Sequence, residues 1–166
     1  MTSTAAIARP APRPTQPDEA RAAQLRAANI NPRTGLATDY LNHFNEAIML
    51  LEMIPDMPEC ASDFLEWRPL SYAEHFTASG FKARDLAIEA YQMADSEIRT
   101  EFDHLTASMT RILLEVGTAM RQLQQDKSRI ALAEQAIVWV KPLVMLTAGV
   151  INGAAEADVD SIMASG

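Results

Sequence analysis

The chain has 166 residues, of which 48% are hydrophobic and 6% aromatic, and its net charge is −8. This length supports one domain whose core needs no disulfide or metal ion for stability. Its single cysteine, Cys60, excludes an intramolecular disulfide and has no Cys or His at the spacing of a zinc site, so we expect a reducing, cytoplasmic location. We expect no transmembrane segment, because the longest apolar run, 136–151, contains Lys141 and Pro142 and is shorter than the ~20 residues that span a bilayer.

The charge is unevenly distributed along the chain. Residues 1–35 contain five arginines and two acids, Asp18 and Glu19, and so have a net charge of +3. Because the whole chain has a net charge of −8, residues 36–166 have a net charge of −11. An acidic body of this kind repels phosphate backbones. The charge pattern therefore disfavours nucleic-acid binding.

The first part of the chain is rich in proline and arginine. Residues 1–17 have few large apolar side chains, and we predict a disordered arm there. A short helix is predicted from Asp18 to about Ile30, because Pro32 and Gly35 follow it.

Three further helices are predicted before residue 95. The longest covers residues 38–54 and is followed by the prolines at 55 and 58. Ser71 and Glu74 have the spacing of a capping box, which predicts a helix that ends at Gly80. Another helix is predicted from about 82 to 93.

The clearest pattern is a pair of heptad repeats near the C-terminus. Apolar residues recur in steps of three and four in both segments, and Asp95 and Gly153 are suited to cap the two ends. The core positions are Ile98, Phe102, Leu105, Met109, Ile112, Val116, Ala119 and Leu123 in the first segment, and Ile130, Ala133, Ile137, Val140, Val144, Thr147 and Ile151 in the second. Since a polar break at 125–128 separates them, we predict an antiparallel helical hairpin of about 95–124 and 128–153.

These elements predict an all-α protein, namely a helical bundle built on that hairpin with two or more shorter helices packed on it. Leu132, Trp139, Leu143 and Leu146 widen the apolar stripe of the second arm, so we expect the helices at 38–54 and 82–93 to cover them. Residues 18–153 would form a single domain, and residues 154–166 a flexible acidic tail.

A stripe of methionines gives the main hypothesis about function. Met49, Met53 and Met57 follow each other at intervals of four, with Leu50 beside them and Glu52 and Asp56 close in sequence. Either the 38–54 helix is central and buried on both sides, or the stripe is a surface that binds a partner with apolar and basic groups.

A metal site is the sharpest catalytic alternative. Glu101 and His104 have the Glu-x-x-His spacing used by ferritin-like bundles, and His43 and Glu46 could provide a second pair. The helical angles count against this interpretation, because Glu101 and His104 fall on the polar side of their helix, away from the heptad seam.

No motif for nucleophilic or nucleotide-dependent catalysis is present, and the sequence implies no cofactor. We therefore predict a non-enzymatic helical protein–protein interaction module, such as an adaptor, regulator or assembly subunit, with a homodimer as the default state. Two alternatives stay open: a carboxylate- and histidine-based metal-binding bundle, and an amphipathic protein that coats a lipid or granule surface through the second arm.

Overall fold

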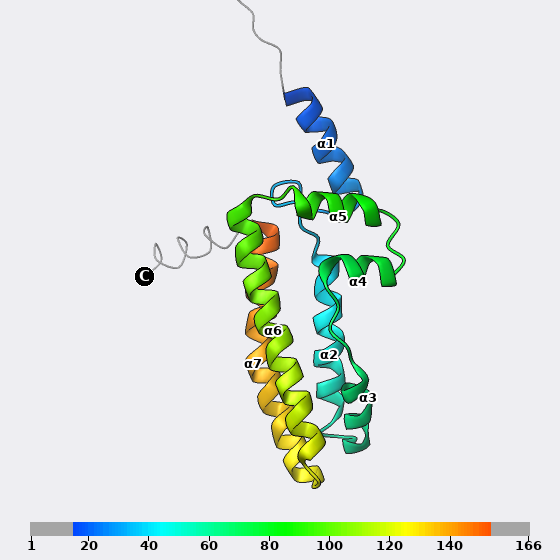
Figure 1. Ribbon diagram of the computed structural model, residues 1–166, viewed down its shortest axis with the longest axis vertical. Coiled ribbons are helices and arrows are strands. Elements are labelled where there is room, and N and C mark those ends of the chain that lie inside the picture. Colours follow the sequence, from blue (N-terminus) through cyan, green and yellow to red (C-terminus); the bar gives the residue numbers. More distant parts are fainter. Residues whose placement is uncertain (1–14, 154–166) are drawn as a thin grey trace, which may run out of the picture.

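The computed structural model describes residues 15–153, and this part of the chain is helical without any strand (Figure 1). The helices in chain order are α1 (Thr15–Ala27), α2 (Leu41–Met53), α3 (Ala61–Glu66), α4 (Tyr72–Ala78), α5 (Arg84–Gln92), α6 (Ser96–Gln122) and α7 (Asp126–Asn152). Short 3₁₀ turns, Thr38–Tyr40 and Pro58–Cys60, precede α2 and α3. The predicted all-α class is confirmed.

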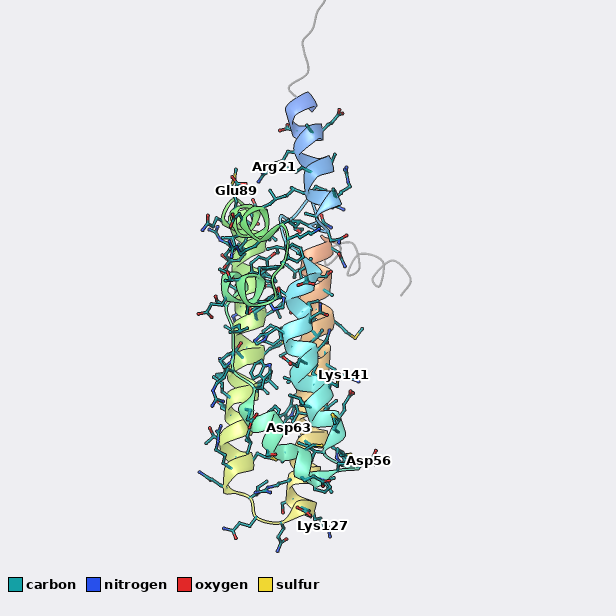
Figure 2. The ribbon with its side chains drawn as sticks, turned by 90° about the vertical axis from the view of Figure 1, so that its right-hand side faces the viewer. Arg21, Asp56, Asp63, Glu89, Lys127 and Lys141 are labelled. Atoms are coloured by element: carbon teal, nitrogen blue, oxygen red, sulfur yellow. The ribbon has the colours of Figure 1, made fainter. Side chains whose placement is uncertain are left out.

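Helices α6 and α7 are the longest elements, with 27 residues each, and lie side by side in both views (Figures 1 and 2). Asp95 caps α6 as predicted, since its Oδ2 accepts hydrogen bonds from the backbone N–H groups of Glu97 and Ile98. Gly153 ends α7 with a φ of +69°, the left-handed conformation that glycine adopts without strain. The bundle built on this pair as an antiparallel hairpin stays a prediction.

Helix α2 packs against α7 and α3 and supplies much of the core. The side facing its neighbours is lined by Leu41, Phe44, Ala47, Ile48 and Leu51, all of them buried. These residues recur at intervals of three and four, so they fall on one face of the helix. The predicted 38–54 helix is thus a 3₁₀ turn followed by an α-helix, and both are positioned by this apolar face.

An aromatic cluster joins the start of α2 to α4, α5 and α6. The centroids of neighbouring rings in this cluster are 4.8–6.2 Å apart, and the rings belong to Tyr40, Tyr72, Tyr91 and Phe102. The Tyr72 hydroxyl accepts a hydrogen bond of 2.9 Å from the buried backbone N–H of Ala37. The predicted capping box at the start of α4 is present, with both of its reciprocal hydrogen bonds.

Helix α1 lies at one end of the molecule, beside α5 (Figure 1). It begins at Thr15, three residues before the predicted start, and an ion pair of 3.0 Å joins Arg21 to Glu89 of α5. Leu25 and Ile30 are buried and attach this segment to the core. Residues 1–14 and 154–166, which hold the rest of the predicted arm and tail, lie outside the described residues.

Candidate interaction surface

The methionine stripe lies on the outward side of α2. Met49, Met53 and Met57 are 53%, 38% and 46% exposed, whereas Leu50 is half-buried against the core. Within residues 15–153, therefore, each of the three methionines keeps a substantial part of its surface in solvent. Large apolar side chains that stay this accessible are uncommon when they cluster, and they are typical of binding surfaces.

Met57 belongs to this surface although it lies beyond the helix. α2 ends at Met53, and the backbone N–H of Met57 donates to the carbonyl oxygen of Met53 over 3.0 Å. Pro58 begins the next 3₁₀ turn, so Met57 adopts an extended rather than a helical φ of −139°. Met57 lies beyond the end of the predicted 38–54 helix, and the turn keeps its backbone next to that of Met53.

Several carboxylates lie close in sequence to this surface. Glu52 forms an ion pair of 2.8 Å with Lys141 of α7, which joins the two helices. Asp56, Glu59 and Asp63 are exposed and form no ion pair within the part of the chain described here. Figure 2 places Asp56 and Lys141 on the same side of the molecule. Exposed apolar groups next to unneutralised acids favour a partner that is both apolar and basic.

A second apolar face lies on α7. Val138, Trp139, Met145 and Leu146 are 64%, 47%, 75% and 57% exposed. The expectation that other helices cover Trp139 and Leu146 is therefore wrong for residues 15–153. The physical reason is that α2 packs on the opposite side of α7, next to Lys141, while α5 packs mainly on α4. Leu132 and Leu143 are only half-buried.

Helix α7 also has the length and composition of a membrane-spanning helix. An 18-residue window within it has a mean hydropathy of 1.5, and only 22% of that window is buried. The sequence-based expectation of no transmembrane segment stays a prediction.

The four residues considered for a metal site are not brought together. Glu101 and His104 are exposed on α6 and Glu46 is exposed on α2, as the helical angles of α6 predict for the first two. His43 is buried, and its Nε2 accepts a hydrogen bond of 2.9 Å from the backbone N–H of Leu70. Residues 15–153 contain no group of three His, Cys, Asp or Glu side chains placed to hold a metal ion.

A partly buried polar pair, His75 and Asp39, lies next to His43. The Nε2 of His75 is 2.9 Å from Oδ2 of Asp39, and the rings of His75 and His43 are 6.2 Å apart. Burial, followed by the nearby His75, lowers the pKa of His43 to about 4. Ser79, whose hydroxyl lies in the lining of the adjoining cavity, donates to the carbonyl oxygen of Phe76 over 3.4 Å rather than to the His75–Asp39 pair.

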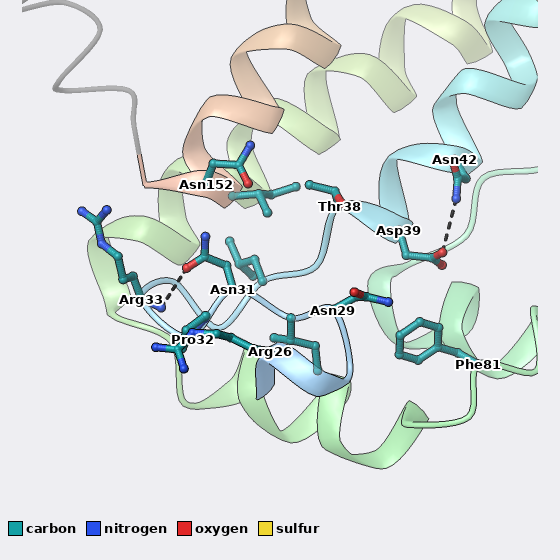
Figure 3. A pocket seen from close by; sticks show the side chains of 13 residues that line it. Arg26, Asn29, Asn31, Pro32, Arg33, Thr38, Asp39, Asn42, Phe81 and Asn152 are labelled. Atoms are coloured by element: carbon teal, nitrogen blue, oxygen red, sulfur yellow. Dashed lines mark hydrogen bonds between the residues drawn. The ribbon is translucent and has the colours of Figure 1, made fainter. Parts of the chain in front are cut away.

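A cavity of about 720 Å³ lies where the loop after α1 meets the start of α2 and the end of α7 (Figure 3). Its polar lining includes Asn29, Asn31, Asp39, Asn42 and Asn152. The Nδ2 of Asn42 donates to Oδ1 of Asp39 over 3.3 Å, and Asn31 Oδ1 accepts from the backbone N–H of Arg33. The Asn31 amide thus organises the loop and the Asn42 amide the start of α2. Sequence patterns carried no signal for the cavity.

Cys60 is not a candidate nucleophile. It is buried, and burial raises the pKa of its thiol, with Asp63 and Glu59 acting in the same direction. The thiolate, which is the reactive form, is therefore disfavoured.

Comparison of the chain with known protein families, with curated proteins and with solved structures finds no match. The assignment of function consequently depends on the surfaces described above.

Proposed function

We propose that this protein is a non-enzymatic, cytoplasmic helical interaction module that acts as an adaptor, regulator or assembly subunit. Its scaffold would be the antiparallel hairpin of α6 and α7, and its partner-binding surface would consist of Met49, Leu50, Met53, Met57, Glu52 and Asp56. The observation that supports this proposal is the exposure of Met49 and Met53 on α2 and of Met57 just beyond its end.

The chemistry of the surface defines the partner. Thioether side chains are flexible and adapt to different apolar shapes. The acids at positions 56, 59 and 63 have no basic neighbour within ion-pair distance in the described residues, and they would attract Lys and Arg. The partner is therefore an amphipathic helix with one apolar and one basic face, the helix-in-groove mode of recognition.

A binding measurement with model peptides tests the proposal. The probes are two synthetic helices with the same leucine pattern, one with Lys and one with Glu on the polar face, each titrated with the full chain by fluorescence anisotropy. We expect the Lys peptide to bind and Met53→Glu to weaken binding at least about tenfold, because a charge would be desolvated against leucine. The matched control is Met93→Glu, an exposed methionine that follows α5.

Three results would contradict the proposal: equal affinity for both peptides, no binding of the Lys peptide, or equal effects of the two substitutions. Circular dichroism of Met53→Glu is the companion measurement. Loss of helix content in that variant would show that the stripe is part of the core rather than a surface.

The exposed face of α7 favours a second candidate, a protein that coats a lipid or granule surface. Val138, Trp139 and Leu146 would insert among acyl chains at the interface. Flotation with vesicles of phosphatidylcholine and phosphatidylglycerol tests it. This candidate would be supported if the unsubstituted chain floats with the vesicles and the Leu146→Glu variant does not. Chain that stays in the soluble fraction would eliminate it.

A further inference from the structure

We propose that the outward face of α7 is covered by α7 of a second copy of this chain, in an antiparallel pair centred on Pro142. This inference uses a different surface from the methionine stripe of α2 and does not depend on it. It turns the general expectation of a homodimer into a defined interface.

The face has the periodicity of a second helix-pairing seam. The exposed positions 131, 135, 138, 142 and 145, followed by the half-buried position 149, recur in steps of four and three, the heptad spacing of helices that pack side by side. At 100° per residue, the small residues Ala131, Pro142 and Gly149 form its central line together with the exposed Gln135. Val138 and Met145 border this line on the Lys141 side, and Trp139 and Leu146 border it on the other side.

The arrangement of large residues is symmetric about Pro142. Val138 lies four positions before it and Leu146 four after, while Trp139 and Met145 lie three before and three after. Two antiparallel copies related by a two-fold axis at Pro142 keep each border of the face on the same side, and would therefore place Val138 beside Met145 of the second copy and Trp139 beside its Leu146. Each contact would occur twice, as a two-fold interface requires.

The exposed apolar side chains supply more than half of the surface that a standard dimer interface buries on each partner. The four exposed side chains present roughly 500 Å² of surface, at the upper end of the ~300–600 Å² of the largest patch on a typical monomer. A standard interface buries about 800 Å² per partner. The remainder would come from the rest of α7, whose 27 residues extend about 40 Å.

Charge favours a second copy over a membrane as the occupant. The whole chain carries −8, but α7 contains three bases (Lys127, Arg129, Lys141) against two acids (Asp126, Glu134), a balance of +1. Two copies thus meet through their least acidic helix, with each Lys141 already paired with Glu52 at the edge of the face. An acidic chain is repelled by anionic lipid headgroups, and this face has no row of Lys or Arg to offset that repulsion.

Light scattering on the full-length chain tests the interface. We expect a particle of twice the 18.2 kDa chain mass. Leu146→Glu and Val138→Glu should each weaken dimerisation about a hundredfold, because a carboxylate would be buried without a partner, and should leave helix content unchanged. The control is Leu114→Glu, the same kind of change at an exposed leucine of α6, which should remain dimeric.

Oxidative crosslinking tests the direction of the pair. Pro142→Cys should form a disulfide-linked dimer, since the two positions meet at the axis. Val138→Cys should not crosslink to itself, because eight residues of helix, about 12 Å, would separate the two sulfur-bearing positions, and a disulfide requires Cα atoms within about 7 Å. The native Cys60 is buried, so unsubstituted chain serves as the blank.

The proposal would be overturned by a monomeric full-length chain, by a dimer that resists both α7 substitutions, or by equal crosslinking of the two cysteine variants. A monomer that floats with phosphatidylcholine and phosphatidylglycerol vesicles would assign the face to lipid instead. Since Met53→Glu leaves this face intact, the dimer and the peptide-binding surface can fail independently.

Discussion

The indole of Trp67 stacks on the imidazole of His43, with ring centroids 4.6 Å apart and an angle of 25° between the planes. The same indole donates a hydrogen bond of 3.1 Å from Nε1 to the carbonyl oxygen of His43. His43 in turn accepts from Leu70 through Nε2, which leaves the proton of the neutral ring on Nδ1. Protonation of Nε2 would break this last hydrogen bond, so the segment after α3 is held by an uncharged histidine.

Stability should therefore fall as the pH is lowered from about 6.5 to about 4. The pKa of His43 is lowered to about 4 in the folded protein, from 6.5 in the unfolded chain. In this window the unfolded chain binds more protons, so the free energy of unfolding decreases as pH falls. The contribution is complete above pH 6.5, and its loss is on the order of 2–3 kcal/mol. Urea unfolding at a series of pH values measures it.

His43→Gln is the control for that pH dependence. A glutamine can offer an oxygen to the Leu70 N–H but does not titrate between pH 4 and 6.5. The variant should therefore show a smaller change in the free energy of unfolding across this window. Identical slopes for the variant and the unsubstituted chain would assign the effect to carboxylates.

Tyr72→Phe should destabilise the protein by about 1–3 kcal/mol. The hydroxyl of Tyr72 is the acceptor for the buried N–H of Ala37, and its removal leaves that donor without a partner. Tyr91→Phe is the matched change. The Tyr91 hydroxyl donates a hydrogen bond of 2.7 Å to the exposed carboxylate of Asp103, and water can replace this donor in the variant. We expect a cost below about 1 kcal/mol for that variant. Equal losses in chemical denaturation would contradict the assignment.

Two glycines with positive φ should respond differently to alanine. Gly35 has a φ of +75°, and an added Cβ would lie 2.8 Å from the carbonyl oxygen of Ala90. Gly80 has a φ of +69° but open space around the same position. Gly80→Ala should cost about 1 kcal/mol from backbone strain alone. Gly35→Ala should cost clearly more, as measured by thermal unfolding, because backbone of α5 would have to move.

The ion pair between Glu52 and Lys141 should contribute little to stability. Both side chains are about half exposed, so water and salt screen their attraction. A double-mutant cycle with Glu52→Gln and Lys141→Gln should give a coupling energy of about 0.2–1 kcal/mol that decreases in high salt. A coupling well above that range, unchanged by salt, would show that the pair is effectively shielded from solvent.

Local signals in the sequence were sufficient for much of the helix assignment. The capping box at Ser71 and Glu74, the N-cap at Asp95 and the stop at Gly153 are all present in the structure. Each depends on hydrogen bonds or backbone angles within a few residues, so neighbouring side chains suffice to specify it. The outward orientation of Glu101 and His104 followed in the same way from helical periodicity.

The candidate site was less accessible to such reasoning. The methionine stripe was recognised from its spacing, but the sequence left open whether it was buried. The outward face of α7 was expected to be covered, because periodicity shows that a side chain is apolar and not which helix, if any, packs against it. The meeting of Asp39 with His75, 36 positions apart, had no local signal at all.

By itself, the amino-acid order determined the helical class and most helix ends, since these arise from 3.6-residue periodicity and from caps that act over one turn. Only the tertiary structure decided which apolar side chains remain in solvent and which polar groups become partners. Those outcomes depend on where α2 packs on α7 and how the loop after α1 returns to the core. Such long-range placement results from the competition of many apolar faces for burial, and no single segment specifies it.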